Sequence, residues 1–160
     1  MIDCLENKSK GASIRCLVKK TEKSEGLSQK FRELLARERR KKYNTADPFI
    51  RLHKKILKQG IKIRRQVKEF QRKGKKTMGF GASVGITTML YFYRIGNKLE
   101  ALLDDNPARW NLWSPGLGLP VLQPERVRGK PMVLVLAWRY WKSIKNRHGT
   151  SQNFKLTRWR

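Results

Sequence analysis

The sequence predicts an α/β fold in which a small parallel sheet is flanked by helices, with a long basic helix in the N-terminal half. Two observations predict the sheet. Residues 78–85 have the order of a strand, a glycine turn and a helix, and a second apolar stretch follows that ends in Asp104 and Asp105. Residues 131–137 are an almost continuous apolar run, which is typical of a parallel strand covered on both faces.

The predicted organisation is a flexible N-terminus over 1–12, followed by one domain over 13–160. Within this domain, 13–73 would hold a strand and basic helices, and 74–160 would hold the α/β part. A chain of 160 residues suits one domain, or one domain with an extension.

Three elements are expected in the N-terminal half. Alternation over 13–18 predicts a strand, and helical spacing over 28–42 predicts a helix. The pair Asp47-Pro48 combines an N-cap residue with a first-turn proline, and it predicts the start of a helix that runs to about residue 72. Gly60 interrupts this helix and is expected to weaken it by roughly 1 kcal/mol relative to alanine.

The C-terminal half alternates strands and helices, which favours a parallel sheet. Trp138, just after the apolar run, is expected to be buried at the end of that strand. The expected elements, in order, are a strand over 77–80, a helix over 83–94, a strand over 99–103, a loop over 106–124, the apolar strand, a helix over 139–147 and an edge strand within 154–159.

The charge is extreme, because 38 lysines and arginines face 12 acids for a net charge of +26. Such a field attracts RNA, DNA and phosphorylated small molecules, so non-specific polyanion binding at low salt is expected. The basic residues gather within 37–42 and 54–68. They support a second hypothesis, a nucleic-acid-binding accessory protein, although no RNA-recognition motif, zinc finger or helix-turn-helix is evident.

Cys4 and Cys16 are too few for a disulfide framework and do not have a zinc-site spacing, so free thiols in a reducing compartment and no metal site are expected. No apolar run reaches about 18 residues and the N-terminus does not resemble a signal peptide, so no membrane association and a cytoplasmic location are expected. The scarce acids and two histidines form no recognisable catalytic constellation.

The glycine turn predicts a phosphate site. Gly79 and Gly81 would allow a tight turn and a close approach of phosphate to the backbone. Ala82 and Ser83 lead into the following helix, whose first N–H groups can bind the same phosphate. An alternative is that Gly81 only lets the helix pack on the strand.

Asp104 lies about 20 residues after this turn, where dinucleotide-binding folds place an acid that binds a ribose. It is expected either to contact a ribose or to shape the turn. The motif is imperfect, because the third glycine is Gly85 and not residue 84. Trp110 and Trp113, in the loop that follows, would either stack on a ligand ring or serve packing.

Several short segments, in a common order and spacing, resemble the C-terminal domain of the S-adenosylmethionine-dependent sugar C-methyltransferases. The resemblance covers about residues 10–158. It is carried by 10–15 (KGASIR), 80–83 (FGAS), 104–107 (DDNP), 114–121 (SPGLGLPV) and 134–138 (LVLAW).

This resemblance implies a Rossmann-like fold that binds a nucleotide-sugar or a related phosphorylated ligand at the carboxyl edge of its sheet. It also implies that Lys10, Ser13 and Arg15 belong to a segment that faces the active site. Lys10 replaces the histidine of the family's pattern, and Gly118 replaces a second histidine. These changes remove polar groups that could contact substrate, so no catalytic residue is assigned.

Full-length members of that family also have a zinc-binding motif and a central methyl-donor domain, and neither has a counterpart here. The chain is therefore expected to bind no cofactor alone, and S-adenosylmethionine would be supplied by a partner protein or another domain. Methyl transfer by this chain alone is not expected. A third hypothesis is a degenerate domain with no ligand.

Overall fold

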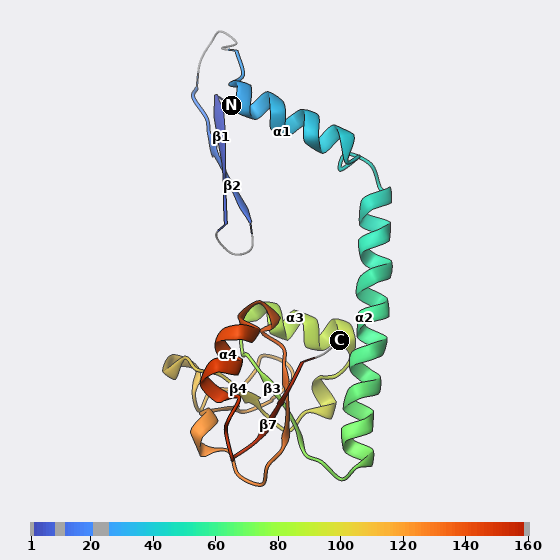
Figure 1. The fold of residues 1–160 in the computed structure, drawn as a ribbon, viewed down its shortest axis with the longest axis vertical. Helices are drawn as coiled ribbons and strands as arrows, with labels where there is room; N and C mark the ends of the chain where they lie inside the picture. The colour runs from blue at the N-terminus through green and yellow to red at the C-terminus, as the bar shows by residue number, and fades with distance from the viewer. Residues whose placement is uncertain (1, 9–11, 21–25, 159–160) are drawn as a thin grey trace. The chain divides into compact units, whose positions relative to one another are not determined.

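The structure is a computed structural model that describes residues 2–8, 12–20 and 26–158. The chain divides into two compact units, Met1–Lys55 and Ile56–Arg160 (Figure 1). The boundary falls inside helix α2 (Asp47–Arg72), whereas the sequence led us to expect the α/β part to begin after residue 73. The difference arises because the second half of α2 supplies Ile63 and Val67 to the core of the second unit.

The first unit contains a hairpin and a helix. Strand β1 (Asp3–Asn7) pairs antiparallel with β2 (Ser13–Leu17), and helix α1 (Gln29–Arg40) packs against β1. The expectation of a flexible segment over 1–12 therefore does not describe residues 3–7. Their backbone is held by β2, and the side chain of Cys4 is buried. Ser28 caps α1, because its Oγ accepts a hydrogen bond of 3.2 Å from the N–H of Phe31.

The second unit is built on a parallel sheet of five strands in the order β5-β4-β3-β6-β7. Its α/β class, its parallel sheet and the long helix of the N-terminal half are confirmed. The strands are β3 (Thr77–Phe80), β4 (Leu102–Leu103), β5 (Val121–Leu122), β6 (Met132–Val135) and β7 (Lys155–Thr157). β3 is central, and Gly79 stands opposite Leu102 on one neighbour and Leu134 on the other.

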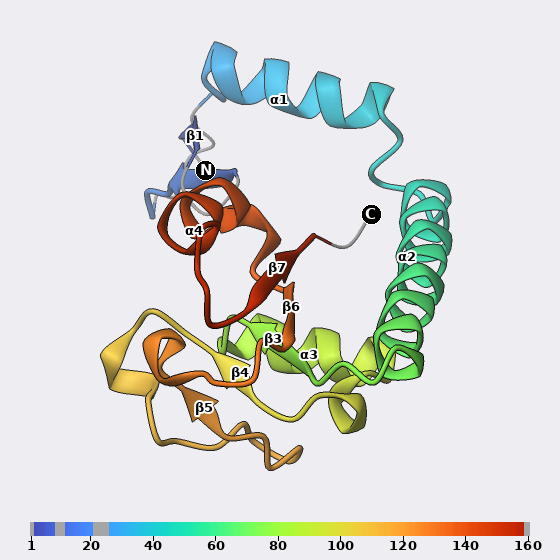
Figure 2. The ribbon, with the colours of Figure 1, turned by 60° about the horizontal axis from the view of Figure 1, so that its bottom comes forward.

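Helices cover both faces of this sheet (Figure 2). The second half of α2 and helix α3 (Val84–Tyr93) pack on one face, and helix α4 (Trp141–His148) packs on the other. Four single-turn helices complete the unit: η2 (Gly96–Lys98), η3 (Pro107–Arg109), η4 (Pro124–Arg126) and η5 (Trp138–Tyr140).

The apolar run in β6 is explained by this arrangement. Successive side chains of a strand point to opposite faces, so Val133 and Val135 pack under α4 while Leu134 and Leu136 pack under α2 and α3. All four are fully buried. A strand in the middle of a sheet with two covered faces needs apolar residues at every position, as the sequence pattern indicated.

None of the helices in the described ranges is long and apolar enough to cross a membrane. Helix α2 is amphipathic rather than apolar. Ile63 and Val67 of its second half are buried, and lysines and arginines fill much of the remaining surface.

Candidate functional site

A sharp turn joins β3 to α3 at the carboxyl edge of the sheet. Gly81 forms it with φ +112°, a backbone conformation that residues other than glycine rarely adopt. Its N–H donates to the carbonyl of Leu103 at 2.6 Å, and the carbonyl of Phe80 accepts from the N–H groups of Leu136 and Ala137 at 3.0 Å. The turn is therefore held by the last residue of β4 and by the chain that follows β6, and it places Ala82 and Ser83 at the start of α3.

Asp104 fastens this turn to the loop that follows β4. Its carboxylate is nearly buried and accepts three hydrogen bonds: Oδ2 accepts from the Ala82 N–H at 2.8 Å and from Nη1 of Arg109 at 2.9 Å, and Oδ1 accepts from the Asn106 N–H at 2.9 Å. Its backbone carbonyl accepts from Nε1 of Trp110 at 2.7 Å. Asp104 therefore shapes the turn, and contact between Asp104 and a ribose stays a prediction.

The loop after η3 folds back beside α3. Trp113 forms a bridge with Pro120, and Ser114 closes the tip through a bond of 2.8 Å from its N–H to the carbonyl of Leu119. Gly116 lies so close to the hydroxyl of Tyr91 that a β-carbon there would have no room. These contacts hold the loop as one wall of a cavity.

The cavity has a volume of about 370 Å³, within the range of small-molecule sites. Its walls are mostly apolar. The guanidinium of Arg109 contributes a positive charge to the lining, and Trp113, which is 66% exposed, lies at the rim. The lining residues are Ala82, Ser83, Val84, Thr87, Thr88, Arg109, Leu112, Trp113, Ser114, Pro115 and Val121.

The N-terminus of α3 opens into this cavity without a side-chain cap. Ser83 is the N-cap residue in extended conformation, but its hydroxyl accepts no hydrogen bond from the helix, and the first turn holds no acid. The first N–H groups of a helix have no partner within the helix, and they favour an anion. An uncapped helix start beside the Arg109 guanidinium is thus suited to a phosphate group.

The structure brings Gly81, Ala82, Ser83 and Asp104 together at this edge. Gly79 lies within β3, where a β-carbon would meet Leu136 Cδ1 at 2.5 Å and Leu102 Cδ2 at 2.9 Å, so it serves close packing. Its approach to phosphate stays a prediction.

The other predicted site residues belong to the N-terminal segment. Ser13 and Arg15 lie on β2 in the first unit, and Lys10 lies outside the described residues.

Sequence reasoning missed Arg109, which the structure joins to Asp104. Arg109 follows Asp104 by five residues in a proline-containing loop, and no sequence motif marks this spacing as a contact. The expectation that Trp138 is buried was wrong: it is 49% exposed, because the chain turns into η5 directly after the strand. The guanidinium of Arg139 covers its ring at 5.2 Å.

The cavity does not fit a methyl donor of the sulfonium type, which is a cation. Arg109 and a helix N-terminus favour anions, and the carboxylate of Asp104 is already engaged by three donors. No group of three or more histidine, cysteine or acidic side chains suited to a metal ion occurs in the described part of the chain.

Comparison with known proteins supports the resemblance in the sequence. The family model described as C-methyltransferase C-terminal domain matches residues 8–155. A search of curated proteins found no match. The matched range includes the glycine turn, Asp104 and the whole cavity wall.

Proposed function

The chain belongs to the C-methyltransferase C-terminal domain family, and from this premise we propose that its second unit binds a nucleotide-sugar, or a related phosphorylated ligand, in the cavity at the carboxyl edge of the sheet. The observation that carries this proposal is the uncapped start of α3, which opens into that cavity beside Arg109.

The phosphates would bind at the turn. Backbone N–H groups at the start of α3 and the hydroxyl of Ser83 would donate to one phosphate. Arg109 uses Nη1 to reach Asp104, which leaves other N–H groups of its guanidinium for a second oxygen. Because Asp104 accepts from the Ala82 N–H just before α3 and from Arg109, it would align the start of α3 and the guanidinium without touching the ligand.

The rest of the ligand would lie against the loop wall. Trp113 and Leu112 are exposed apolar side chains at the cavity, and a base or sugar ring can stack on an indole. Thr87 contributes a hydroxyl from the next turn of α3. An apolar wall with a few polar groups is typical of small-molecule sites.

We propose that the chain contributes substrate binding to an S-adenosylmethionine-dependent methyltransferase, in which another domain or a partner protein holds the donor. Carbon methylation needs a donor and a base near the acceptor. No imidazole or carboxylate lines the cavity in the ranges that the structure describes. Ligand binding without methyl transfer is therefore expected from this chain alone.

The test is calorimetric titration with a deoxysugar nucleotide at about 0.3 M salt, where the screening length is well under about 10 Å. Ser83→Asp would cap α3 with its own carboxylate, which stabilises the fold by about 0.5–1 kcal/mol while it repels phosphate. Ser143→Asp adds the same charge on the exposed surface of α4 and serves as the matched control.

We expect saturable binding to the unmodified chain, at least about tenfold weaker binding to Ser83→Asp, and binding within about twofold of the original for Ser143→Asp. No binding by the unmodified chain would overturn the proposal. Equal losses in the two aspartate variants would also overturn it, because they would reduce the binding to bulk charge.

A further inference from the structure

A second and larger cavity lies at the opposite edge of the sheet in the same unit. Its volume is about 670 Å³, and it shares no lining residue with the cavity at the carboxyl edge. Four of its lining residues are lysines: Lys75, Lys130, Lys145 and Lys155.

The parallel sheet explains why these lysines converge. Lys75 precedes β3 by two residues, Lys130 precedes β6 by two residues, and Lys155 is the first residue of β7. The three strands are adjacent and parallel, so their amino ends meet at one edge. Backbone bonds from Met132 to Lys76 (2.8 Å) and from Lys155 to Pro131 (3.0 Å) fix this register at the edge itself.

In the part of the chain that the structure describes, the lysines of this cavity have no acidic partner. Within the described ranges no aspartate or glutamate lines it, and none of its four ammonium groups forms an ion pair. Neighbouring lysines behave differently, because Lys73 pairs with Glu69 at 2.6 Å and Lys76 pairs with Glu100 at 3.4 Å. Like charges that line one cavity repel each other, and a multivalent anion would remove that cost.

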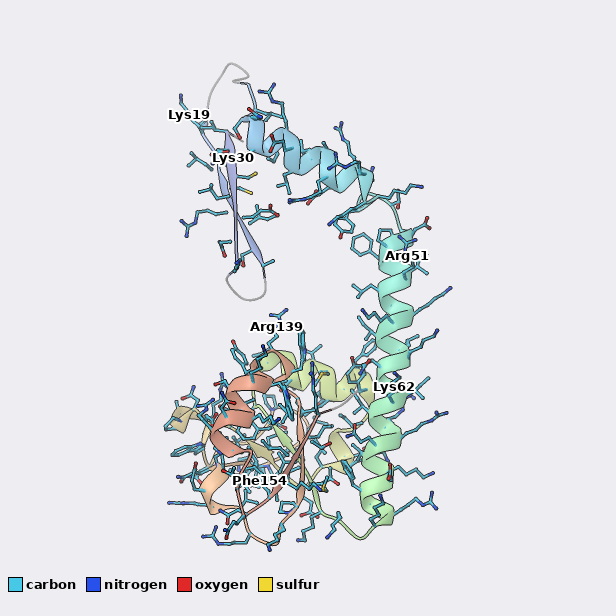
Figure 3. The ribbon with its side chains drawn as sticks, viewed as in Figure 1. Lys19, Lys30, Arg51, Lys62, Arg139 and Phe154 are labelled. Atoms are coloured by element: carbon cyan, nitrogen blue, oxygen red, sulfur yellow. The ribbon has the colours of Figure 1, made fainter. Side chains whose placement is uncertain are left out.

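Four apolar side chains form part of the cavity wall. Met132, Trp141, Phe154 and Leu156 line it, and Phe154 is buried in the core under α4 (Figure 3). The guanidinium of Arg158 lies 5.9 Å from the ring centre of Trp141 and adds a fifth cation nearby. A mixed apolar and cationic lining is suited to a ligand that combines phosphates with an organic part.

We propose that this cavity at the amino edge is a second binding site, for a small ligand that has two or more phosphate groups. A small ligand is favoured over a polymer because four lysines line one cavity of small-molecule volume. The lysine heads bind the phosphates, and the side chains of Met132, Trp141 and Leu156 contact the organic part.

The test uses the full chain and inorganic tripolyphosphate, titrated by calorimetry at about 0.3 M salt. The variant Lys130→Gln/Lys155→Gln removes two charges from the cavity. The control Lys62→Gln/Lys68→Gln removes two charges from exposed positions of α2 in the same unit (Figure 3 labels Lys62). All four side chains are exposed, so the variants are expected to fold, and circular dichroism checks this.

We expect saturable binding that is at least about tenfold weaker in the cavity variant and changed less than about twofold in the control. Equal losses in both variants would overturn the proposal, as would no loss in the cavity variant. The site is also overturned if a single-stranded RNA of about ten nucleotides binds at this salt and tripolyphosphate does not.

The Ser83→Asp variant separates this site from the one at the carboxyl edge. We expect it to keep tripolyphosphate binding and to lose the deoxysugar nucleotide. Loss of tripolyphosphate in Ser83→Asp, with retention in Lys130→Gln/Lys155→Gln, would place the anion at the turn after β3 and overturn the second site. If only the nucleotide titration fails, the proposed function is overturned and the second site at the amino edge is not.

Discussion

Gly81 faces Ala137 where β3 and β6 end, and a β-carbon on residue 81 would lie 2.9 Å from the β-carbon of Ala137. The same residue has φ +112°. We predict that Gly81→Ala lowers the free energy of unfolding by about 2–3 kcal/mol, because it combines backbone strain with a clash. Urea denaturation measures this loss.

Gly85 provides the control for that measurement. It is exposed in the first turn of α3, and a β-carbon there meets nothing within 4 Å. Gly85→Ala should therefore be neutral or stabilise by about 0.5 kcal/mol. If both alanine variants had similar stability, the turn would not need glycine at 81. A larger side chain at 81 is for the same reason a poor probe of ligand binding, because the fold itself would suffer.

Asp104→Ala should destabilise the second unit by about 2–4 kcal/mol. The change leaves the Ala82 and Asn106 N–H groups and the Arg109 guanidinium without their acceptor. Glu100→Ala removes an exposed partner of Lys76 and should cost less than about 1 kcal/mol. Chemical denaturation of both variants checks the contrast, and equal losses would contradict the fastening role of Asp104.

Gly60→Ala should destabilise the protein, although alanine is the better helix former. A β-carbon at 60 would lie 2.7 Å from Cδ1 of Tyr93, whose ring is buried enough to raise the pKa of its hydroxyl. We expect a loss of about 1–3 kcal/mol from overpacking. The double variant Gly60→Ala/Tyr93→Leu tests the contact, because leucine in place of Tyr93 leaves room for the new β-carbon. Gly60→Ala should therefore cost less stability in the Tyr93→Leu background than in the original protein. Equal costs in the two backgrounds would contradict this contact.

The two cysteines should react at different rates with a thiol reagent. Burial, and then the nearby Asp3 carboxylate, raise the pKa of the Cys4 thiol, whereas Cys16 is exposed. Single-thiol variants Cys4→Ser and Cys16→Ser separate the two rates. We expect Cys16 to react at least about tenfold faster near pH 7, and the gap to narrow at alkaline pH as Cys4 ionises.

The raised pKa of Cys4 also predicts how the stability of the fold changes with pH. The folded state holds the Cys4 proton more tightly than the unfolded chain does, so the stability that this thiol contributes is present below the ordinary cysteine pKa of about 8.5 and is lost as the pH rises above it. The Cys4→Ser variant should lack this alkaline loss. An identical pH profile for both proteins would contradict the assignment.

RNA binding should be strong at low salt and weak at about 0.3 M salt, without sequence preference. This follows from the net charge of +26, because binding that depends on released counterions falls steeply with salt. Fluorescence anisotropy with two unrelated single-stranded RNAs measures it. Tight binding near physiological salt with a clear preference for one RNA would instead favour the nucleic-acid-binding accessory protein.

The parts of the fold that local pattern determines were predictable. The strand over 77–80 has the bounds that were expected, and the helix beginning at Asp47 ends at Arg72. The apolar run indicated a parallel strand, and the glycine turn indicated where the sheet's carboxyl edge lies. Each of these depends on neighbouring residues in the chain, which the sequence displays directly.

The parts that depend on distant contacts were not predictable. β1 is polar, and its strand conformation depends on pairing with β2. The cavity wall depends on the hydrogen bond that Arg109 donates to Asp104 and on the approach of Tyr91 to Gly116. The close approach of Tyr93 to Gly60 was not predictable either, because helix propensity contains no information about a tyrosine more than thirty residues away.

The strand order also constrains when the second unit can form during synthesis. β3 lies between β4 and β6, and β6 ends at Val135, so the central strand has one open side until residue 135 has left the ribosome. Parallel pairings between distant segments form slowly, since the intervening chain must first be closed into a loop. The nascent protein therefore leaves the backbone N–H and C=O groups on one side of β3 without their strand partner while more than fifty residues are still being added.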